Sequence, residues 1–351
     1  MTNVLNPASL DRVVDLTQAI VQIPNVWDIY EKLGIFTKRF LTQKTALVPK
    51  YTEITEVLTD VNWGGRATNS KKGTRSYVTF QIPRFANDDS ITADDLEGLV
   101  EWYSIFQATN LETTQSVRLR KMEQARRTLA QTQELARGQL INNGTVYAPN
   151  GTISTSYGST VNFYTELGVS QTTVNVSLAT LTADPKISFE PIIRAIQDNL
   201  QAGVIASGIV CICSPTFFNQ LISHPYVKQS FLYWEQTQSA AVLSGRLEAN
   251  VFGLDERYRT FRYNNITFIE ELAAFPQIAS GEGRAFPTNI PNMFGTYYAP
   301  ARRLKTVNTP AQELYWFEFL NEKDDYIEIE YETNFANVLL YPQAIVRVTA
   351  V

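Results

Sequence analysis

The sequence contains few of the residues that enzymes and metal sites most often use. Among 351 residues there is one histidine, His224, and there are two cysteines, Cys211 and Cys213. A single histidine excludes a His-Glu-x-x-His zinc motif, and the two cysteines do not form a Cys-x-x-Cys pair. Neither a Gly-x-Ser-x-Gly nucleophile elbow nor a Gly-x-x-x-x-Gly-Lys-Ser/Thr phosphate loop occurs. We therefore expect no catalytic activity and no cofactor.

The rare residues themselves fit structural roles. His224 stands before Pro225 at a predicted helix end, where a turn or capping role is expected. Cys211 and Cys213 alternate on an apolar strand, and neighbours on one face of a strand make a poor disulfide. We expect two free thiols in the core, which suits a reducing cytoplasm. No apolar run of about 18 residues is present, so no transmembrane helix is predicted, and the amino terminus does not resemble a signal peptide.

Acidic residues are absent from residues 63–84. This segment carries five basic side chains, which are Arg66, Lys71, Lys72, Arg75 and Arg84. Apolar and polar residues alternate at 46–59 and 77–82, which predicts the two strands of a long hairpin. The centre of the hairpin has too few apolar residues to form a core, so its tip should project into solvent or lie on another chain.

A long helix with a narrow apolar stripe is predicted next. Thr92 and Asp95 have the spacing of a capping box at a helix start. Residues 111–142 continue the pattern, and about 30 residues at ~1.5 Å each give a rod of ~45 Å. A coiled-coil dimer is the alternative, although Gln115 and Gln133 interrupt any heptad.

Charge is unevenly distributed along a chain whose formal net charge is -5. Residues 113–139 are basic, whereas residues 312–333 hold eight acidic residues and one lysine. On the predicted strand 326–331, Glu328 and Glu330 share one face. Two carboxylates can perform acid–base chemistry only with a partner and a cleft. An edge strand that meets basic residues of another copy is the simpler interpretation.

The remaining segments alternate between predicted helices and strands. Helices are expected at 9–22, in an amino-terminal arm, at 189–203, and from residue 215 onward. Residues 143–186 are rich in turn signals and predict β-hairpins or extended loops. Strands are expected at 204–213, at 261–270 with a turn at Asn264-Asn265, and at 315–319, 326–331 and 344–348. The order predicts an α+β protein.

The order of elements, together with particular stretches near both ends, resembles a known family. The stretches are Phe40-Leu-Thr-Gln-Lys-Thr-Ala-Leu-Val-Pro49, followed by residues 66–83, then Asn292-Met-Phe-Gly-Thr-Tyr-Tyr-Ala-Pro300, then Ile327-Glu-Ile-Glu-Tyr-Glu-Thr-Asn-Phe335, and lastly Tyr341-Pro-Gln-Ala-Ile-Val-Arg347. They resemble the major capsid protein of tailed bacteriophages, in the lambda-like capsid protein E family, which has the Hong Kong phage (HK-ninety-seven-like) shell fold.

The resemblance implies a division of the chain. It implies an amino-terminal arm at 1–46, an extended β-hairpin loop at 47–91, a peripheral domain at 92–186 with a spine helix at 92–142, an axial α+β domain at 187–313, return strands of the peripheral domain at 314–336, and a final axial strand at 337–351.

The resemblance also implies a function. It implies a structural capsid protein that self-assembles into pentamers and hexamers of an icosahedral head around double-stranded DNA, located in the virion and assembled in the host cytoplasm. The implied partners are further copies, scaffolding and portal proteins, a decoration protein at three-fold positions, and DNA bound without sequence reading. No membrane is implied. Some relatives cross-link a loop lysine to a neighbour's asparagine, and Lys71 or Lys72 lies in the corresponding region.

We hypothesise that the basic and acidic segments meet between copies. The residues of this hypothetical interface are Arg66, Lys71, Lys72, Arg75, Arg84, Arg118, Arg126, Arg127, Glu318, Glu328, Glu330 and Glu332. Two alternatives remain. One is a nanocompartment shell of the same fold that encloses cargo proteins, and the other is an enzyme that uses Glu328 and Glu330.

Overall fold

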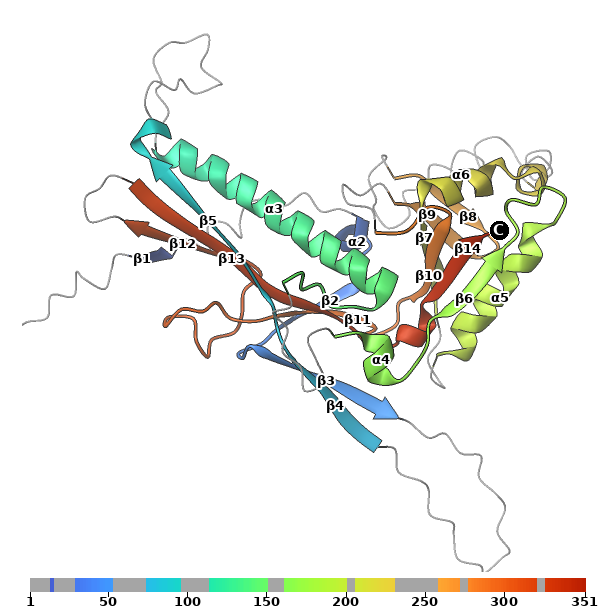
Figure 1. Ribbon diagram of the computed structural model, residues 1–351, viewed down its shortest axis with the longest axis horizontal. Coiled ribbons are helices and arrows are strands. Elements are labelled where there is room, and N and C mark those ends of the chain that lie inside the picture. Colours follow the sequence, from blue (N-terminus) through green and yellow to red (C-terminus); the bar gives the residue numbers. More distant parts are fainter. Residues whose placement is uncertain are drawn as a thin grey trace, which may run out of the picture.

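Two six-stranded β-sheets and a separate two-stranded hairpin form the framework of the chain (Figure 1). The computed structural model describes residues 13–15, 29–52, 74–95, 114–150, 161–200, 206–230, 258–271, 277–320 and 326–351. None of the helices in these ranges is long and apolar enough to cross a membrane.

The first sheet is organised around one long strand, β13 (Tyr326–Leu339). Its first half pairs with β12 (Tyr315–Leu320) on one side and β5 (Arg84–Thr92) on the other. Its second half pairs with β11 (Phe294–Tyr298), which pairs in parallel with β2 (Phe36–Phe40). The short strand β1 (Val13–Asp15) adds to the free edge of β12. Segments far apart in the sequence therefore meet on β13.

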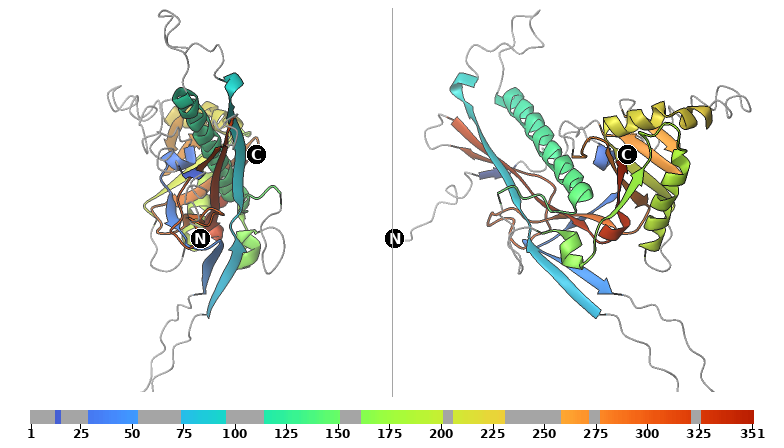
Figure 2. Two further views of the ribbon diagram at one scale, coloured as in Figure 1. Left: turned by 90° about the vertical axis from the view of Figure 1, so that its left-hand side faces the viewer. Right: turned by 45° about the vertical axis from the view of Figure 1, so that its right-hand side comes forward.

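A single long helix covers one face of this sheet. The helix α3 spans Thr114–Asn143, which are 30 residues and correspond to a rod of ~45 Å. Its apolar stripe, including Met122 and Leu129, packs on Trp316 and Ile329 of the sheet. Figure 1 and the two views of Figure 2 show α3 running beside β5 and β13. The predicted long helix is thus confirmed over 114–142.

The second sheet has the order β6-β14-β10-β7-β9-β8. Its strands are β6 (Thr172–Val176), β14 (Val346–Ala350), β10 (Glu282–Thr288), β7 (Gly208–Cys213), β9 (Ile266–Glu270) and β8 (Thr260–Tyr263). The helices α5 (Pro185–Asp198) and α6 (Pro215–Ser223) share one apolar cluster with Cys211 and Cys213 on one face of β7. The alternating residues Val210 and Ile212 face the cluster that also contains Leu140 of α3. The second sheet is therefore apolar on both faces.

Three sequence predictions hold in this sheet. Cys211 and Cys213 are free and fully buried, and burial raises the pKa of the Cys211 thiol to about 12. The Asn264-Asn265 turn joins β8 to β9, with φ angles of 47° and 61° as a two-residue hairpin turn requires. His224 caps the carboxyl end of α6, and its backbone N–H donates to the Leu221 carbonyl.

The hairpin of β3 (Thr45–Thr52) and β4 (Thr74–Gln81) confirms the predicted long hairpin. The antiparallel register pairs Ala46 with Phe80 and Val48 with Val78, and these four side chains belong to the main apolar cluster. The strands project away from both sheets in every view (Figures 1 and 2). The basic residues between the strands lie outside the described residues.

Part of the predicted arm is firmly anchored in the body. The helix α2 (Ile29–Lys32) precedes β2, and Glu134 of α3 accepts hydrogen bonds from the backbone N–H groups of Tyr30 and Glu31 at 3.0 and 2.9 Å. The fully buried Arg137 pairs with Glu31 and with Glu134. Such a cluster is stable only because each buried charge has a partner. Residues 29–40 are thus part of the core.

Several predictions of local structure were wrong because pairing across the sheet overrode local patterns. Residues 13–15, within a predicted helix, form β1 against β12. Residues 161–186, expected as β-hairpins or extended loops, contain the helix α4 (Phe163–Leu167) and the strand β6, which pairs in parallel with β14. The strand β13 is central rather than an edge strand, since β5 occupies its other side.

The capping contacts predicted for the helix start near residue 92 are present. The backbone N–H and the hydroxyl of Thr92 donate to the Asp95 carboxylate at 3.0 and 3.1 Å. Residues 84–92 belong to β5, and the 3₁₀ turn η2 (Ala93–Asp95) follows them at the end of this described range. A second such turn, η5 (Pro342–Ala344), precedes β14. The helix expected over residues 96–113 lies outside the described residues.

The expected domain ranges also cross sheet boundaries. The strand β2 falls in the arm range 1–46 and β11 in the axial range 187–313, yet both join the sheet of β13. The strand β6 falls in the peripheral range 92–186, yet it joins the sheet of β14. Sheet membership depends on long-range pairing, which a linear division of the chain does not contain.

Two glycines with similar backbone angles provide a test of the packing after α3. Gly144 (φ 67°) follows α3, and a Cβ there would lie 2.5 Å from the Tyr164 ring, whereas a Cβ on Gly34 (φ 62°) would meet nothing within 4 Å. We predict that Gly34→Ala lowers the free energy of unfolding by about 1–2 kcal/mol, the cost of a left-handed non-glycine residue. Gly144→Ala should cost a further ~1–3 kcal/mol from overpacking. Denaturant unfolding measures both, and equal losses would show that Tyr164 moves freely.

Candidate subunit interface

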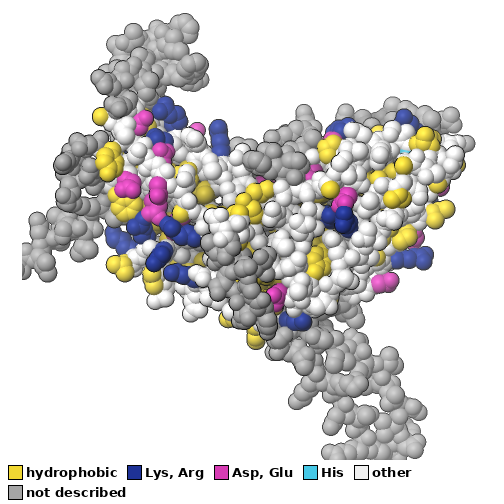
Figure 3. All heavy atoms as spheres, viewed as in Figure 1, with side chains coloured by type: hydrophobic (Ala, Val, Ile, Leu, Met, Phe, Trp, Pro, Cys, Tyr) yellow, Lys and Arg dark blue, Asp and Glu magenta, His cyan; other side chains and the backbone are white. Residues whose placement is uncertain are grey.

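The face of the β5–β13–β12 region that points away from α3 carries most of the predicted interface acids. We call it the outer face. Side chains alternate along each strand, and the register Arg84↔Asn334, Asp88↔Glu330 and Phe317↔Glu330 determines which residues share this face. The outer face comprises Arg84, Asp88, Ser90, Tyr315, Phe317, Phe319, Glu328, Glu330, Glu332 and Asn334. In Figure 3 acidic and basic side chains lie next to each other in this part of the molecule.

The centre of the outer face is neutralised within the chain. The Arg84 guanidinium forms ion pairs with Glu330 and Glu332. Arg303, from the segment between β11 and β12, forms an ion pair with Glu330 and lies 4.6 Å from the centroid of the Phe319 ring. Glu330 and Glu332 therefore have basic partners in their own chain, on the neighbouring strand β5 and in the segment between β11 and β12.

The opposite face contributes a second set of ion pairs, which attach α3 to the sheet. The Arg118 Nε donates to Glu318 at 2.7 Å, and the Trp316 indole N–H donates to the same carboxylate at 3.0 Å. Lys121 lies 2.9 Å from Asp89. Glu318 is 2 % exposed, so its charge depends on these donors.

The other predicted basic residues have four different surroundings. Arg126 is buried on α3, and its desolvation lowers the pKa of the guanidinium, an effect that Glu313 and Tyr298 oppose. Arg127 is exposed and has no ion pair among the described residues. Arg75 lies on β4 opposite Tyr51. The others, Arg66, Lys71 and Lys72, lie outside the described residues.

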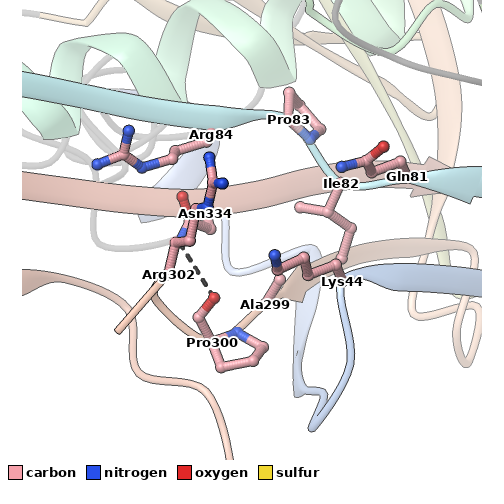
Figure 4. A pocket seen from close by; sticks show the side chains of 9 residues that line it. All are labelled: Lys44, Gln81, Ile82, Pro83, Arg84, Ala299, Pro300, Arg302 and Asn334. Atoms are coloured by element: carbon pink, nitrogen blue, oxygen red, sulfur yellow. Dashed lines mark hydrogen bonds between the residues drawn. The ribbon is translucent and has the colours of Figure 1, made fainter. Parts of the chain in front are cut away.

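A hollow of about 340 Å³ lies at the end of the outer face where β13 meets the base of the hairpin (Figure 4). We call it the basic pocket. Lys44, Arg84 and Arg302 contribute its charged groups, and no acidic residue lines it. It is lined by Lys44, Gln81, Ile82, Pro83, Arg84, Ala299, Pro300, Arg302 and Asn334.

Asn334 at the floor of the basic pocket is incompletely paired. Its Nδ2 donates to the Pro300 carbonyl at 3.4 Å, drawn as a dashed line in Figure 4, and to Glu332 at 3.3 Å. Its Oδ1 is buried without a hydrogen-bond partner, although the residue is only 5 % exposed. A buried amide oxygen without a donor is unfavourable, and such a group can be satisfied by an incoming donor.

The hairpin β3–β4 presents an exposed apolar face. Leu47 and Tyr77 are 59 % and 60 % exposed, and their register with Thr79 and Pro49 places both on the face opposite the buried Val48 and Val78. The hairpin is therefore apolar on both faces, and only one of them is covered by the described part of the chain.

The geometry contains no candidate active site for the two predicted carboxylates. Glu330 is held by two guanidinium groups, and Glu328 is exposed without a partner among the described residues. Within the described ranges no group of three or more His, Cys, Asp or Glu residues is arranged to hold a metal ion. A general acid and base need a shared substrate and a cleft, and Glu328 does not line the basic pocket.

Sequence reasoning grouped some of these residues correctly and missed others. It named Arg84, Glu330 and Glu332 as partners, and the structure brings them together within one chain. It did not single out Lys44, Arg302 or Arg303. The adjacent Arg302 and Arg303 lie in a stretch, residues 283–312, that contains no acidic residue, and this signal could have identified them.

Two arginines on α3 allow a test of its attachment to the sheet. Arg118→Ala should leave the buried Glu318 carboxylate with the Trp316 donor alone and lower the free energy of unfolding by about 1–3 kcal/mol. Arg127→Ala removes an exposed arginine from the same helix and should change it by less than about 0.5 kcal/mol. Chemical denaturation of both variants measures the difference, and a similar small effect for each would contradict the role of Arg118.

Comparisons with known proteins point to one family. Residues 12–350 match the sequence model of the family described as phage major capsid protein E. The chain is 35 % identical over 343 residues to the major capsid protein of Pseudomonas phage KPP10, with 95 % of each chain covered. It is 25 % identical over 362 residues to the major capsid protein of Salmonella phage Felix O1, with 96 % of each covered.

A solved structure supports the same fold. The capsid of Ralstonia phage GP4 matches with a TM-score of 0.53 at 10 % identity, covering 94 % of this chain and 93 % of the other. At this identity the likeness concerns the fold alone. The α+β shell fold expected from the sequence is confirmed.

Proposed function

The chain belongs to the phage major capsid protein E family, and on that basis we propose that its copies form the pentamers and hexamers of an icosahedral head enclosing double-stranded DNA. The protein is a structural component of the viral capsid rather than an enzyme. The proposal concerns how this chain meets its neighbours, and which of its surfaces do so.

The observation that carries the proposal is the exposed apolar face of the β3–β4 hairpin. A two-stranded hairpin is at best marginally stable alone in water. Here one face packs on the body through Val48 and Val78, while Leu47 and Tyr77 on the other face remain exposed. A neighbouring subunit that covers Leu47 and Tyr77 would convert the hairpin into a buried layer.

In this proposal the free energy of assembly comes from the surface area buried between copies rather than from ion pairs. An exposed ion pair contributes only ~0–1 kcal/mol, whereas obligate interfaces bury ~2,000–5,000 Å². Several weak contacts made by each copy add up through multivalency. Charged residues fix the register of neighbouring copies more than their affinity.

The domain assignment follows the two sheets. We assign the sheet of β13 with α3 to the peripheral domain and the sheet of β7 with α5 and α6 to the axial domain, around the five-fold and six-fold axes. We assign the β3–β4 hairpin to the extended loop.

The proposal also includes partners other than further copies of the chain. They are scaffolding and portal proteins, a decoration protein at three-fold positions, and packaged DNA contacted without reading its sequence, with assembly in the host cytoplasm. A net charge of -5 fits a wall that encloses DNA without binding it tightly. The proposal leaves out a lysine–asparagine cross-link because Lys71 and Lys72 lie outside the described residues.

The two alternatives are less well supported. A cargo-enclosing nanocompartment would share the fold, but the relatives with substantial sequence identity are major capsid proteins of phages. A carboxylate enzyme would need Glu330 free to transfer protons, and Arg84 and Arg303 hold it in ion pairs.

Substitutions on the two faces of the hairpin test the proposal. Leu47→Asp with Tyr77→Asp should leave the free energy of unfolding within about 0.5 kcal/mol, because both side chains are exposed in the single chain. The same variant should form no closed particles in electron micrographs, because two charges would be buried at the contact.

A variant on the covered face is the matched control. Val48→Asp places the charge beside Leu47 in sequence but on the buried face, so the subunit itself should lose about 3 kcal/mol or more of stability. Normal particles from the Leu47→Asp, Tyr77→Asp variant would contradict the proposed role of the hairpin.

A further inference from the structure

The charges of the outer face are not all neutralised within the chain. Glu328 is exposed at one end of it and Asp88 is exposed next to the centre, opposite Glu330 on β5, and neither has an ion pair or side-chain hydrogen bond among the described residues. Lys44 and Arg302 likewise have no acidic partner in the described part of the chain, and they line the basic pocket at the other end. Along β13 the outer face therefore passes from free acid, through the paired centre, to free base.

The basic pocket has the features of a binding site rather than a chance hollow. It combines two cationic groups without partners, an apolar wall that includes Ile82 and Pro300, and the buried Asn334 Oδ1 that lacks a donor. An occupant that supplies carboxylate oxygens to the cations and one hydroxyl or N–H donor to Asn334 would satisfy all of them.

The acidic end of the same face supplies that chemistry. Asp88 and Glu328 offer two carboxylates, and Ser90, which lies opposite Glu328 on β5, offers a hydroxyl donor. Both acids lie away from the pocket of their own chain, and Asp88, opposite Glu330, is four strand positions or ~13 Å from the level of Asn334. Glu328 and Asn334 are six residues apart on one strand, which corresponds to ~20 Å. The centre of the sheet between them is fixed by the pairs of Arg84 and Arg303.

We propose that the basic pocket of one copy receives Asp88 and Glu328 of the next copy. This inference rests on the proposed self-assembly and names residues that set its register. The contact is head-to-tail, because the donating and accepting groups lie at opposite ends of one face. Head-to-tail contacts build rings or open chains rather than closed pairs. An acidic strand of the same protein is favoured over a nucleic-acid phosphate because its Ser90 hydroxyl can also satisfy Asn334.

Cross-linking of assembled wild-type protein tests the contact directly. A carbodiimide reagent joins an amine to a carboxylate that touches it, without a spacer. Particles assembled from a mixture of ¹⁵N-labelled and unlabelled copies should give peptides in which Lys44 of one isotope is joined to Asp88 or Glu328 of the other. Lys228, exposed beyond α6, is the reference amine and should give no link to these acids. Particles whose other lysines cross-link between copies while Lys44 joins neither acid would overturn the proposal.

Charge reversal provides an independent readout. Lys44→Glu with Arg302→Glu, and Asp88→Lys with Glu328→Lys, should each reduce particle yield in sedimentation by about tenfold or more. The combined four-fold variant should restore the yield, because the pairs are recreated with opposite sign. Arg194→Glu with Lys228→Glu makes the same charge change on the exposed surface of the second sheet and should assemble as the wild type does.

The outcomes separate this inference from the proposed function. Wild-type particles together with normal yields from both reversed pairs would overturn the contact and leave self-assembly standing. Failure of the combined variant to recover, with its subunit folded by circular dichroism, would also overturn the contact. A wild-type protein that forms no particles at all would contradict the proposed function and this inference with it.

Discussion

The packing of one long helix against only one face of a sheet is the constraint on which the rest of the structure depends. The helix α3 covers β5, β13 and β12 from one side, with Trp316 and Ile329 in the contact. The charged pairs of Arg118 and Lys121 fix it there. Because α3 is committed to that face, the outer face and the β3–β4 hairpin must be completed by other means. Other segments of the same chain cover the outer face and the hairpin only in part.

The middle of the outer face is covered and paired within the chain to a greater extent than its two ends. The segment that follows β11 brings Arg303 over Phe317 and Phe319 and pairs it with Glu330, so the middle of the face is satisfied. The two ends retain unpaired charge of opposite sign. A surface that is neutral at its centre and polar at its ends gives orientation without strong attraction, and weak oriented contacts allow misplaced subunits to dissociate. The affinity between copies then comes from apolar surface, such as the hairpin face around Leu47 and Tyr77.

Much of the local structure could be predicted from the sequence, because it follows from short-range patterns. The periodicity of residues 111–142 predicts α3, the alternation on either side of the basic segment predicts β3 and β4, and Asn264-Asn265 predicts the β8–β9 turn. Each of these elements depends on residues close in the sequence. The general α+β architecture and the capsid fold were also identified from the order of such elements and the resemblance.

The parts that could not be predicted depend on pairing between distant segments. Residues 13–15 fit a helical pattern, but β12 offers a strand edge to them. The acidic strand 326–331 reads as an edge strand, and it becomes central because residues 84–92 pair along it. The interface hypothesis placed the partners of Glu330 in another subunit, whereas Arg84 and Arg303 reach it in the same chain. Charge complementarity in a sequence does not distinguish these two cases, since both satisfy the same acids.

The central claim is that the hairpin is completed only by a neighbouring subunit, and amide hydrogen exchange measures this most directly. Exchange of the β3 and β4 amides is compared between unassembled subunits and closed particles, with the amides of β7 in the buried sheet as the internal reference. The account predicts that assembly slows exchange in the hairpin by at least about tenfold, equivalent to about 1.4 kcal/mol, and leaves β7 nearly unchanged. Equal protection of the hairpin in the free subunit and in the particle would contradict it.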